Sequence, residues 1–210
     1  YKNTSSGQII GMDVTVPALQ DVKVRQAIFY AINPKDIQTA VLNGWGYTTV
    51  GIATPSPASL LTGDDLDAYV NDSAKAKQLM SDAGISSLDL EFTVANYGES
   101  YLSTAELVVA QLMGIGVNAT IKIIDPTTYT TKVLYGTPGS YELFLGPIQP
   151  TPSANAGLMN LYLSTGAQNT SGINDPDLDK MILDQSVEVD AEKRQQMLLD
   201  IQHKLMELAI

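Results

Sequence analysis

The sequence predicts a single α/β domain in which helices flank a sheet. Segments with the two-residue alternation of strands are interleaved with segments whose apolar residues recur at helical spacing. One strand–helix–strand run, over 88–124, has the length and order of a βαβ unit. The chain has 210 residues, 44% of them hydrophobic and 17% charged, which is typical of one packed globular domain.

The first strand is expected at 8–16, a run of apolar and β-branched residues that stops before Pro17. Asp21 has a good N-cap side chain for the helix that follows. Apolar residues recur at intervals of three and four over 21–32, so we expect a helix there with one buried face.

A second helix is expected to start at Asn33 and Pro34, a cap followed by proline at the first helical position. It should run to Leu42 and end at Gly44. The segment 44–71 fits neither a long helix nor a long strand. A loop of that length in a compact domain usually has a function or covers another part of the fold.

The middle of the chain gives the clearest pattern. A short helix is expected from Ser73 to its end at Ala83-Gly84, and a half-buried strand over 88–94. A helix over 102–113 and a β-branched strand over 117–124 follow. The two strands of this βαβ unit should be parallel, with a right-handed connection.

The remaining elements follow from caps and short apolar runs. Asp125-Pro126 begins a helix to Tyr135, 141–146 is a buried strand, and helices are expected over 176–188 and 190–208. Prolines follow the strand directly, so the chain leaves the sheet at the strand's carboxyl end. In open α/β sheets ligands bind at that end.

Composition excludes several classes of function. The net charge is 12 − 23 = −11, which disfavours binding to nucleic acid. Cysteine is absent, so disulfides, thiolate metal sites and cysteine nucleophiles are excluded. His203 is the only histidine and lies off the apolar stripe of its helix, so we expect a solvated surface residue. We expect no metal and no cofactor.

Two kinds of motif have simple structural explanations. Gly114 and Gly116 form a GxG after a helix, whereas a dinucleotide-binding loop needs glycines after a strand, so they predict a helix end. The aspartates at 64–67 and 175–179 lack the glycine and glutamate of a calcium loop. No acids are spaced so as to demand catalysis, and we expect a protein that is not an enzyme; a carboxylate-based hydrolase is the less favoured alternative.

Large aromatic side chains lie in loops at the ends of predicted elements. Trp45 and Tyr47 are in the first long loop, and Tyr97 and Tyr101 follow the strand that ends near Val94. Such residues either line a ligand cleft, offering area and one polar atom each, or pack the loops onto the domain. The sequence leaves both readings open.

Six segments, in order, resemble the extracellular solute-binding proteins of family 5, which are the peptide-, oligopeptide- and nickel-binding proteins of ABC importers. The first is Pro-Ala-Leu-Gln-Asp-Val-Lys-Val-Arg-Gln-Ala-Ile-Phe-Tyr-Ala-Ile-Asn, starting at Pro17. The resemblance covers nearly the whole chain. The segments are 17–33, 42–46, 76–84, 111–117, 139–146 and 190–205.

The resemblance implies a periplasmic-binding-protein-like fold of type II with two lobes around a ligand. Residues 1–210 are similar to the second lobe alone, with a mixed sheet flanked by helices. The N-terminus lacks Met and the C-terminus directly follows an apolar helical pattern, so we expect the missing first lobe elsewhere in a longer polypeptide. The implied partners are a small peptide or similar solute and an ABC permease in the membrane. The implied location is the periplasm, or a lipid anchor on the outer face of the cytoplasmic membrane.

The implied binding residues show one departure from the family. Many peptide binders carry a Trp and an Asp after the strand that corresponds to 141–146, and here Gly146, Pro147, Ile148 and Gln149 stand there. This leaves the ligand's charge open. A surface adhesion or assembly module that lost solute capture is therefore an alternative function.

Lys132 matches a basic position that meets a peptide carboxylate in some family members, although a helix-surface lysine is the simpler interpretation. The expected cleft side of the lobe is formed by Trp45, Tyr47, Tyr97, Lys132 and the loop 146–149.

Overall fold

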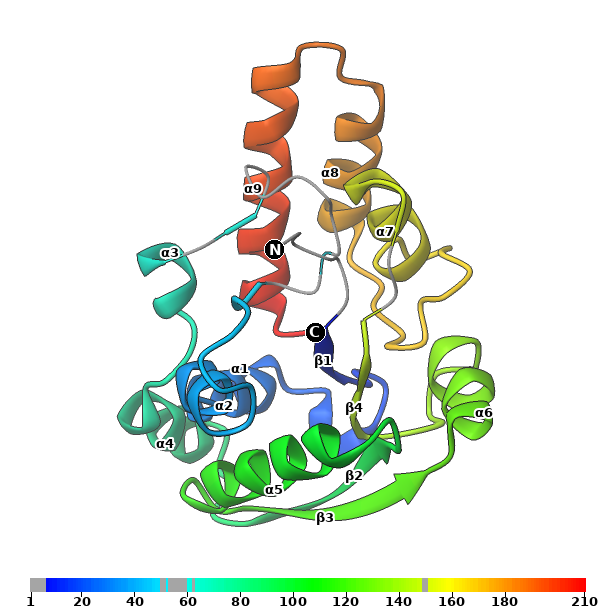
Figure 1. Cartoon of the computed structure of the whole chain (residues 1–210). Coiled ribbons are helices and arrows are strands. Elements are labelled where there is room, and N and C mark those ends of the chain that lie inside the picture. Colours follow the sequence, from blue (N-terminus) through cyan, green and yellow to red (C-terminus); the bar gives the residue numbers. More distant parts are fainter. Residues whose placement is uncertain (1–6, 50–51, 53–59, 62, 149–150) are drawn as a thin grey trace.

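The chain folds into one mixed sheet flanked by helices (Figure 1), as the sequence predicts. The computed structural model describes all residues except 1–6, 50–51, 53–59, 62 and 149–150. The strands are β1 (Gln8–Met12), β2 (Leu88–Ala95), β3 (Val117–Ile124) and β4 (Leu143–Pro147). Their order is β1-β4-β2-β3; β2 is parallel to both of its neighbours, and β1 is an edge strand antiparallel to β4.

The predicted βαβ unit is confirmed. Helix α5 (Glu99–Met113) connects β2 to β3, and the parallel pairing of these strands begins at Leu88 with Val117. Gly116 ends the connection with φ +83°, a left-handed conformation that favours glycine. The GxG sequence is thus the end of a helix, as expected.

Most of the other helices lie close to their predicted positions. The predicted caps work as expected, because each of their side chains accepts a hydrogen bond from a backbone N–H of the first helical turn. These caps are Asp21, Asn33, Asp125, Asp175 and Asp190. The helices are α1 (Val22–Ala31), α2 (Pro34–Ala40), α3 (Asp64–Asp67), α4 (Ser73–Asp82), α6 (Pro126–Tyr129), α7 (Ala154–Leu161), α8 (Pro176–Val187) and α9 (Ala191–Leu208).

Several boundaries differ from the prediction. The strand expected at 8–16 stops at Met12, because the Val14 N–H bonds to the Ser171 carbonyl, outside the sheet. The helix expected over 126–135 is α6 followed by a π-helical segment, Thr130–Leu134. α4 begins at Ser73 as expected, with Asp72 as its cap. α3 and α7 were not predicted.

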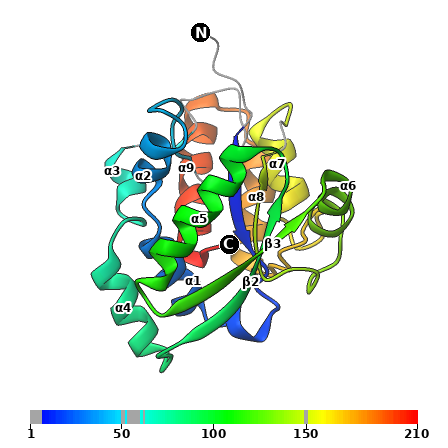
Figure 2. The same ribbon diagram turned by 60° about the horizontal axis from the view of Figure 1, so that its bottom comes forward.

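The sheet separates two cores, and a third lies away from it. The main core fills the space between the sheet and α1, α4 and α5, with Phe92 and Leu143 fully buried. α6 and Tyr129 cover the carboxyl end of the opposite face. Figure 2 shows α5 lying against β2 and β3. The third core joins α7, α8 and α9, which rise away from the sheet in Figure 1.

A buried arginine joins the first long helix to the end of the last one. Arg25 is 5% exposed, and its guanidinium donates to the carbonyls of Leu19, Gln20, Leu208 and Ala209. A cation at a helix C-terminus is favoured by the helix dipole. Arg25 therefore fixes the end of α9 against α1.

His203 is not the solvated residue that the sequence predicts. Its Nδ1 lies 3.2 Å from the hydroxyl of Tyr69, and the side chain is half-buried. The contact links α9 to the segment before α4, a long-range contact that helical periodicity could not reveal.

Candidate functional site

The loop that presents Trp45 is held by its own backbone and one side chain. Asn43, Gly44 and Gly46 all have positive φ, so the chain reverses sharply after α2. The Gln38 side chain donates to the Gly46 carbonyl at 2.6 Å, and the Trp45 N–H bonds to the Leu42 carbonyl at 2.9 Å. The indole is thereby held outward, 64% exposed.

Trp45 lies on the rim of a large cavity. The cavity has a volume of about 620 Å³, within the usual range for small-molecule sites. Trp45, Tyr47 and Ile148, called the rim group below, all line it, as does the edge strand β1. Among the described lining residues none is charged, although the chain carries 35 charged side chains (12 + 23).

A second group, which includes the predicted Tyr97, gathers at the carboxyl ends of β2 and β4. Tyr97, Tyr101 and Tyr129, called the tyrosine group below, pack with ring centroids 5.7 Å apart for Tyr97–Tyr101 and 6.2 Å apart for Tyr97–Tyr129. Tyr97 remains 43% exposed, whereas Tyr129 is fully buried. The group thus runs from the surface to the sheet.

The segment Gly146–Ile148 connects the two groups. The Tyr129 hydroxyl donates to the Pro147 carbonyl at 3.3 Å, and the Tyr129 ring packs on Gly146. Ile148 lines the cavity, and its N–H bonds to the Gly7 carbonyl at 2.9 Å. The described part of the predicted ligand loop, Gly146–Ile148, therefore links the rim group to the tyrosine group.

Two predicted residues are not brought into these groups. Lys132 is exposed on the π-helical segment and is not among the described residues that line the cavity. Gln149 lies outside the described residues.

Tyr129 and the edge of β1 are the features that sequence reasoning missed. Tyr129 looked like one position in a predicted helix, and only the absence of a side chain at Gly146 hinted that something packs against that strand. Burial raises the pKa of the Tyr129 hydroxyl well above its usual range, and nearby tyrosines raise it further. Burial likewise raises the pKa of Tyr101. Both hydroxyls stay protonated at neutral pH, and the Tyr129 hydroxyl donates to the Pro147 carbonyl.

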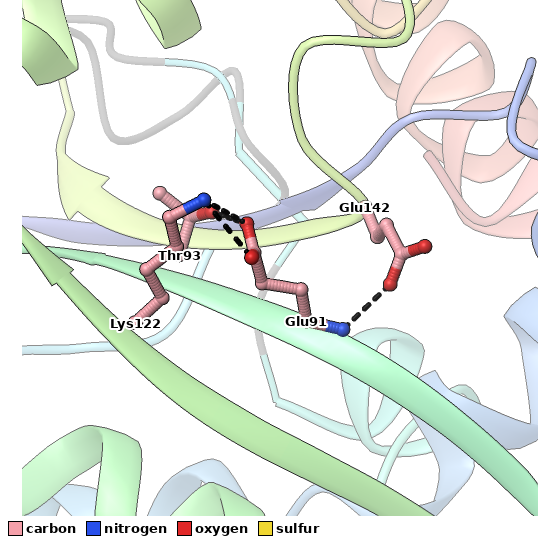
Figure 3. A network of polar contacts seen from close by, with 4 residues as sticks. All are labelled: Glu91, Thr93, Lys122 and Glu142. Atoms are coloured by element: carbon pink, nitrogen blue, oxygen red, sulfur yellow. Dashed lines mark hydrogen bonds and ion pairs between the residues drawn. The ribbon is translucent and has the colours of Figure 1, made fainter.

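The acids that come closest to forming a polar cluster have structural partners (Figure 3). On β2 and β3, Glu91 forms an ion pair with Lys122 at 2.9 Å and accepts from Thr93 at 3.3 Å. The Glu142 carboxylate accepts the Glu91 backbone N–H at 2.5 Å. These contacts support the sheet, and they give the carboxylate-hydrolase alternative no paired acids in the cavity.

Within the described ranges, no three histidine, aspartate or glutamate side chains gather closely enough to hold a metal ion. Among the same residues, no helix has the length and apolar character of a membrane span.

The family model for bacterial extracellular solute-binding proteins, family 5 Middle, matches residues 1–170. A Brucella ovis protein named as an ABC transporter peptide-binding protein is 31% identical over 186 residues, which are 82% of this chain and 34% of that protein. The dipeptide-binding protein of Escherichia coli is 33% identical over 132 residues, 60% of this chain and 24% of that protein.

A solved structure has the same fold. The ABC transporter substrate-binding protein CtaP from Listeria monocytogenes superposes with a TM-score of 0.82 and 25% identity, covering 100% of this chain and 43% of CtaP. This chain therefore spans about a third of the length of the Brucella relative and less than half of CtaP. The Brucella relative and CtaP are both named as binding proteins of ABC transporters, so the matches do not favour the adhesion or hydrolase alternatives.

Proposed function

This chain belongs to the bacterial extracellular solute-binding proteins of family 5, and from that premise we propose that it is one lobe of the substrate-binding component of an ABC importer. The solute is a peptide or a similar small molecule, held between this lobe and another part of a longer polypeptide. No bond is made or broken; binding depends on burial of the solute between two surfaces, and closure of the lobes is coupled to occupancy.

The observation that carries this proposal is the position of Gly146–Ile148 between the rim group and the tyrosine group. Two segments distant in sequence bring exposed aromatic side chains to the two groups: Trp45 and Tyr47 on one, and Tyr97 on the other. Parallel strands place ligands at their carboxyl ends. Tryptophan and tyrosine supply large contact areas with few rotatable bonds, which suits a binding surface.

The described lining of the cavity contributes aromatic and hydrogen-bonding contacts without a charge. This side of the lobe therefore faces the uncharged part of the solute. The charged termini of a peptide are met elsewhere, and Lys132 stays the prediction for a carboxylate. The protein is proposed to act outside the cytoplasmic membrane, in the periplasm or on a lipid anchor, where it delivers the solute to a membrane permease.

The test is native mass spectrometry of the longer natural protein that contains this chain. We expect a bound small molecule of defined mass that is released on denaturation and replaced by an added pool of di- to hexapeptides. A protein that carries no solute and takes up none from the pool would contradict the proposal.

A further inference from the structure

The strand β3 forms one margin of the sheet, and no described strand pairs with its outer side. Its eight residues pair with β2 in one unbroken register, from Leu88 with Val117 to Ala95 with Ile124. An edge strand presents unpaired N–H and C=O groups, and proteins normally protect such an edge with proline, a bulge, a short strand or charge. β3 is long, contains no proline and has no bulge in its register.

The one charged residue of β3, Lys122, does not protect the edge. Its ammonium forms an ion pair with Glu91 of the neighbouring strand at 2.9 Å, on the face of its own sheet (Figure 3). A lysine on an edge opposes pairing because an incoming strand would remove water from its charge. Here Glu91 already supplies the counter-ion, so a further strand can approach without leaving the charge unpaired.

The hydrogen bonds at the two ends of β3 show which backbone groups point outward. The Leu88 N–H bonds to the Gly116 carbonyl, and the Asn96 N–H bonds to the Ile124 carbonyl, both at 2.9 Å. Because every second residue of a strand bonds to a given neighbour, the even-numbered residues of β3 bond to β2. The N–H and C=O groups that point outward therefore belong to Val117, Ala119, Ile121 and Ile123.

We propose that a second copy of this chain pairs with β3, so that two sheets join across a two-fold axis. The two β3 strands run antiparallel, and Thr120 faces Thr120 of the partner subunit on the axis. In this register all four outward-pointing residues are used, since Val117 pairs with Ile123 and Ala119 with Ile121 through backbone hydrogen bonds. Such a pairing occupies the same edge on both copies, so assembly stops at the dimer.

The polar side chains of β3 are complementary to themselves in this register. The pairs without backbone hydrogen bonds bring side chains closest together, and here they are Thr120 with Thr120 and Lys122 with Asn118. Cross-strand threonine pairs are favourable, and each lysine faces an amide instead of another lysine. The Asn118 amide donates to the Asp89 carboxylate at 2.8 Å, so the incoming ammonium also approaches a negative charge. This charge complementarity identifies the partner as a second copy.

The apolar side chains lie on the other face of β3 and match in the same register. Ile123 is 54% exposed and Ile121 is half-buried, although both are large and apolar. Side chains of odd-numbered residues share one face of a strand, so pairing places these isoleucines against Val117 and Ala119 of the partner subunit. Association therefore buries apolar surface that this chain alone leaves in water.

Cysteine cross-linking of the longer protein that contains this chain tests the register. Thr120→Cys should form a covalent dimer that the parent protein does not form. Facing residues of this kind have Cα atoms about 4.5 Å apart, a separation that a disulfide spans. Asn118→Cys and Lys122→Cys are the matched controls. Neither should cross-link alone, because the two equivalent positions lie about 14 Å apart, but an equal mixture of the two variants should.

Sedimentation equilibrium of the longer protein gives a second readout. Its mean mass should rise with concentration toward that of a dimer by about 100 µM protein. Thr120→Lys sets two ammonium groups opposite each other on the axis and should abolish this rise. Thr137→Lys is the matched control, since it adds the same charge at an exposed position outside the sheet, and it should leave the rise unchanged.

A longer protein that stays monomeric at every concentration would overturn the proposal, whether the edge is bare or covered by another part of the polypeptide. Cross-linking by Asn118→Cys alone would also overturn it, because that result requires a different register. β3 lies at the opposite margin of the sheet from β1 and is absent from the described lining of the cavity, so this inference does not depend on the proposed function. Solute binding by a monomer would keep that function and reject the dimer.

Discussion

Only the absence of a side chain at Gly146 lets the Tyr129 ring pack on β4: a Cβ at Gly146 would lie 2.2 Å from the Tyr129 Cζ. That distance is far below van der Waals contact, and the ring is buried and cannot move to solvent. The contact determines how closely the Tyr129 ring packs on β4. It also positions the segment that leads to Ile148.

Gly146→Ala should therefore destabilise the protein by about 1–3 kcal/mol, through overpacking. The matched control is Gly157→Ala in α7, where the nearest atom outside the helix, Thr151 Oγ1, would be 3.4 Å from the new Cβ. This control should be stabilising by about 0.5–1 kcal/mol, because alanine is the better helix former. Urea denaturation of both variants measures the difference, and equal effects would show that Tyr129 does not require glycine.

Arg25→Lys should cost about 2–4 kcal/mol of folding free energy. The lysine side chain is shorter and ends in a single ammonium group, so it leaves some of the buried carbonyls without a donor. Two of the four carbonyls, of Leu19 and Gln20, lie just before α1, and the other two, of Leu208 and Ala209, lie at the end of α9. Arg194→Lys is the control, because it makes the same substitution at a partly exposed site. It should change the folding free energy by no more than about 0.5 kcal/mol. Thermal unfolding of both variants is the measurement, and a neutral Arg25→Lys would contradict this role.

Alkaline pH should weaken the fold through Tyr129. Burial raises the pKa of its hydroxyl, so above about pH 10 the unfolded chain loses a proton that the folded chain keeps. The folded state then binds more protons, and stability falls as pH rises. Tyr129→Phe should reduce this fall between pH 9 and 11, while Tyr135→Phe, at a 66% exposed site, should leave it unchanged. Parallel stability curves for Tyr129→Phe and the parent protein would reject the explanation.

Solute binding by the longer protein should depend on both aromatic groups. Trp45→Ala or Tyr97→Ala should each weaken affinity about 10–100-fold, the usual effect of removing a buried aromatic contact. Tyr135→Ala removes an equally exposed aromatic side chain outside both groups and should leave affinity unchanged. Calorimetric titration with the co-purified solute measures all three, and unchanged affinity in the first two would remove the rim and tyrosine groups from the site.

Much of the fold was predictable because many of its helices and strands are specified by residues that are close together in the sequence. Asn33-Pro34 and Asp125-Pro126 mark helix starts through backbone chemistry alone, and the β2–α5–β3 run is contiguous in sequence. α7 was missed because its helical signal is weak: prolines precede it and Gly157 lies within it.

The site was predictable only in part. Trp45, Tyr47 and Tyr97 were found because large aromatics in loops are unusual, but their grouping depends on strand order. Nothing in the sequence shows that β1 occupies an edge beside β4, so the cavity along it could not be anticipated. The contact between Tyr129 and Gly146 is likewise tertiary.

The central claim is that these 210 residues form one side of a two-sided binding site. Titration calorimetry with a pool of di- to hexapeptides, run on the 210-residue chain and on the longer protein, tests it most directly. We expect micromolar or tighter binding by the longer protein and much weaker binding by the chain alone, because half of the desolvating surface is missing. Micromolar or tighter binding by the 210-residue chain alone would contradict it.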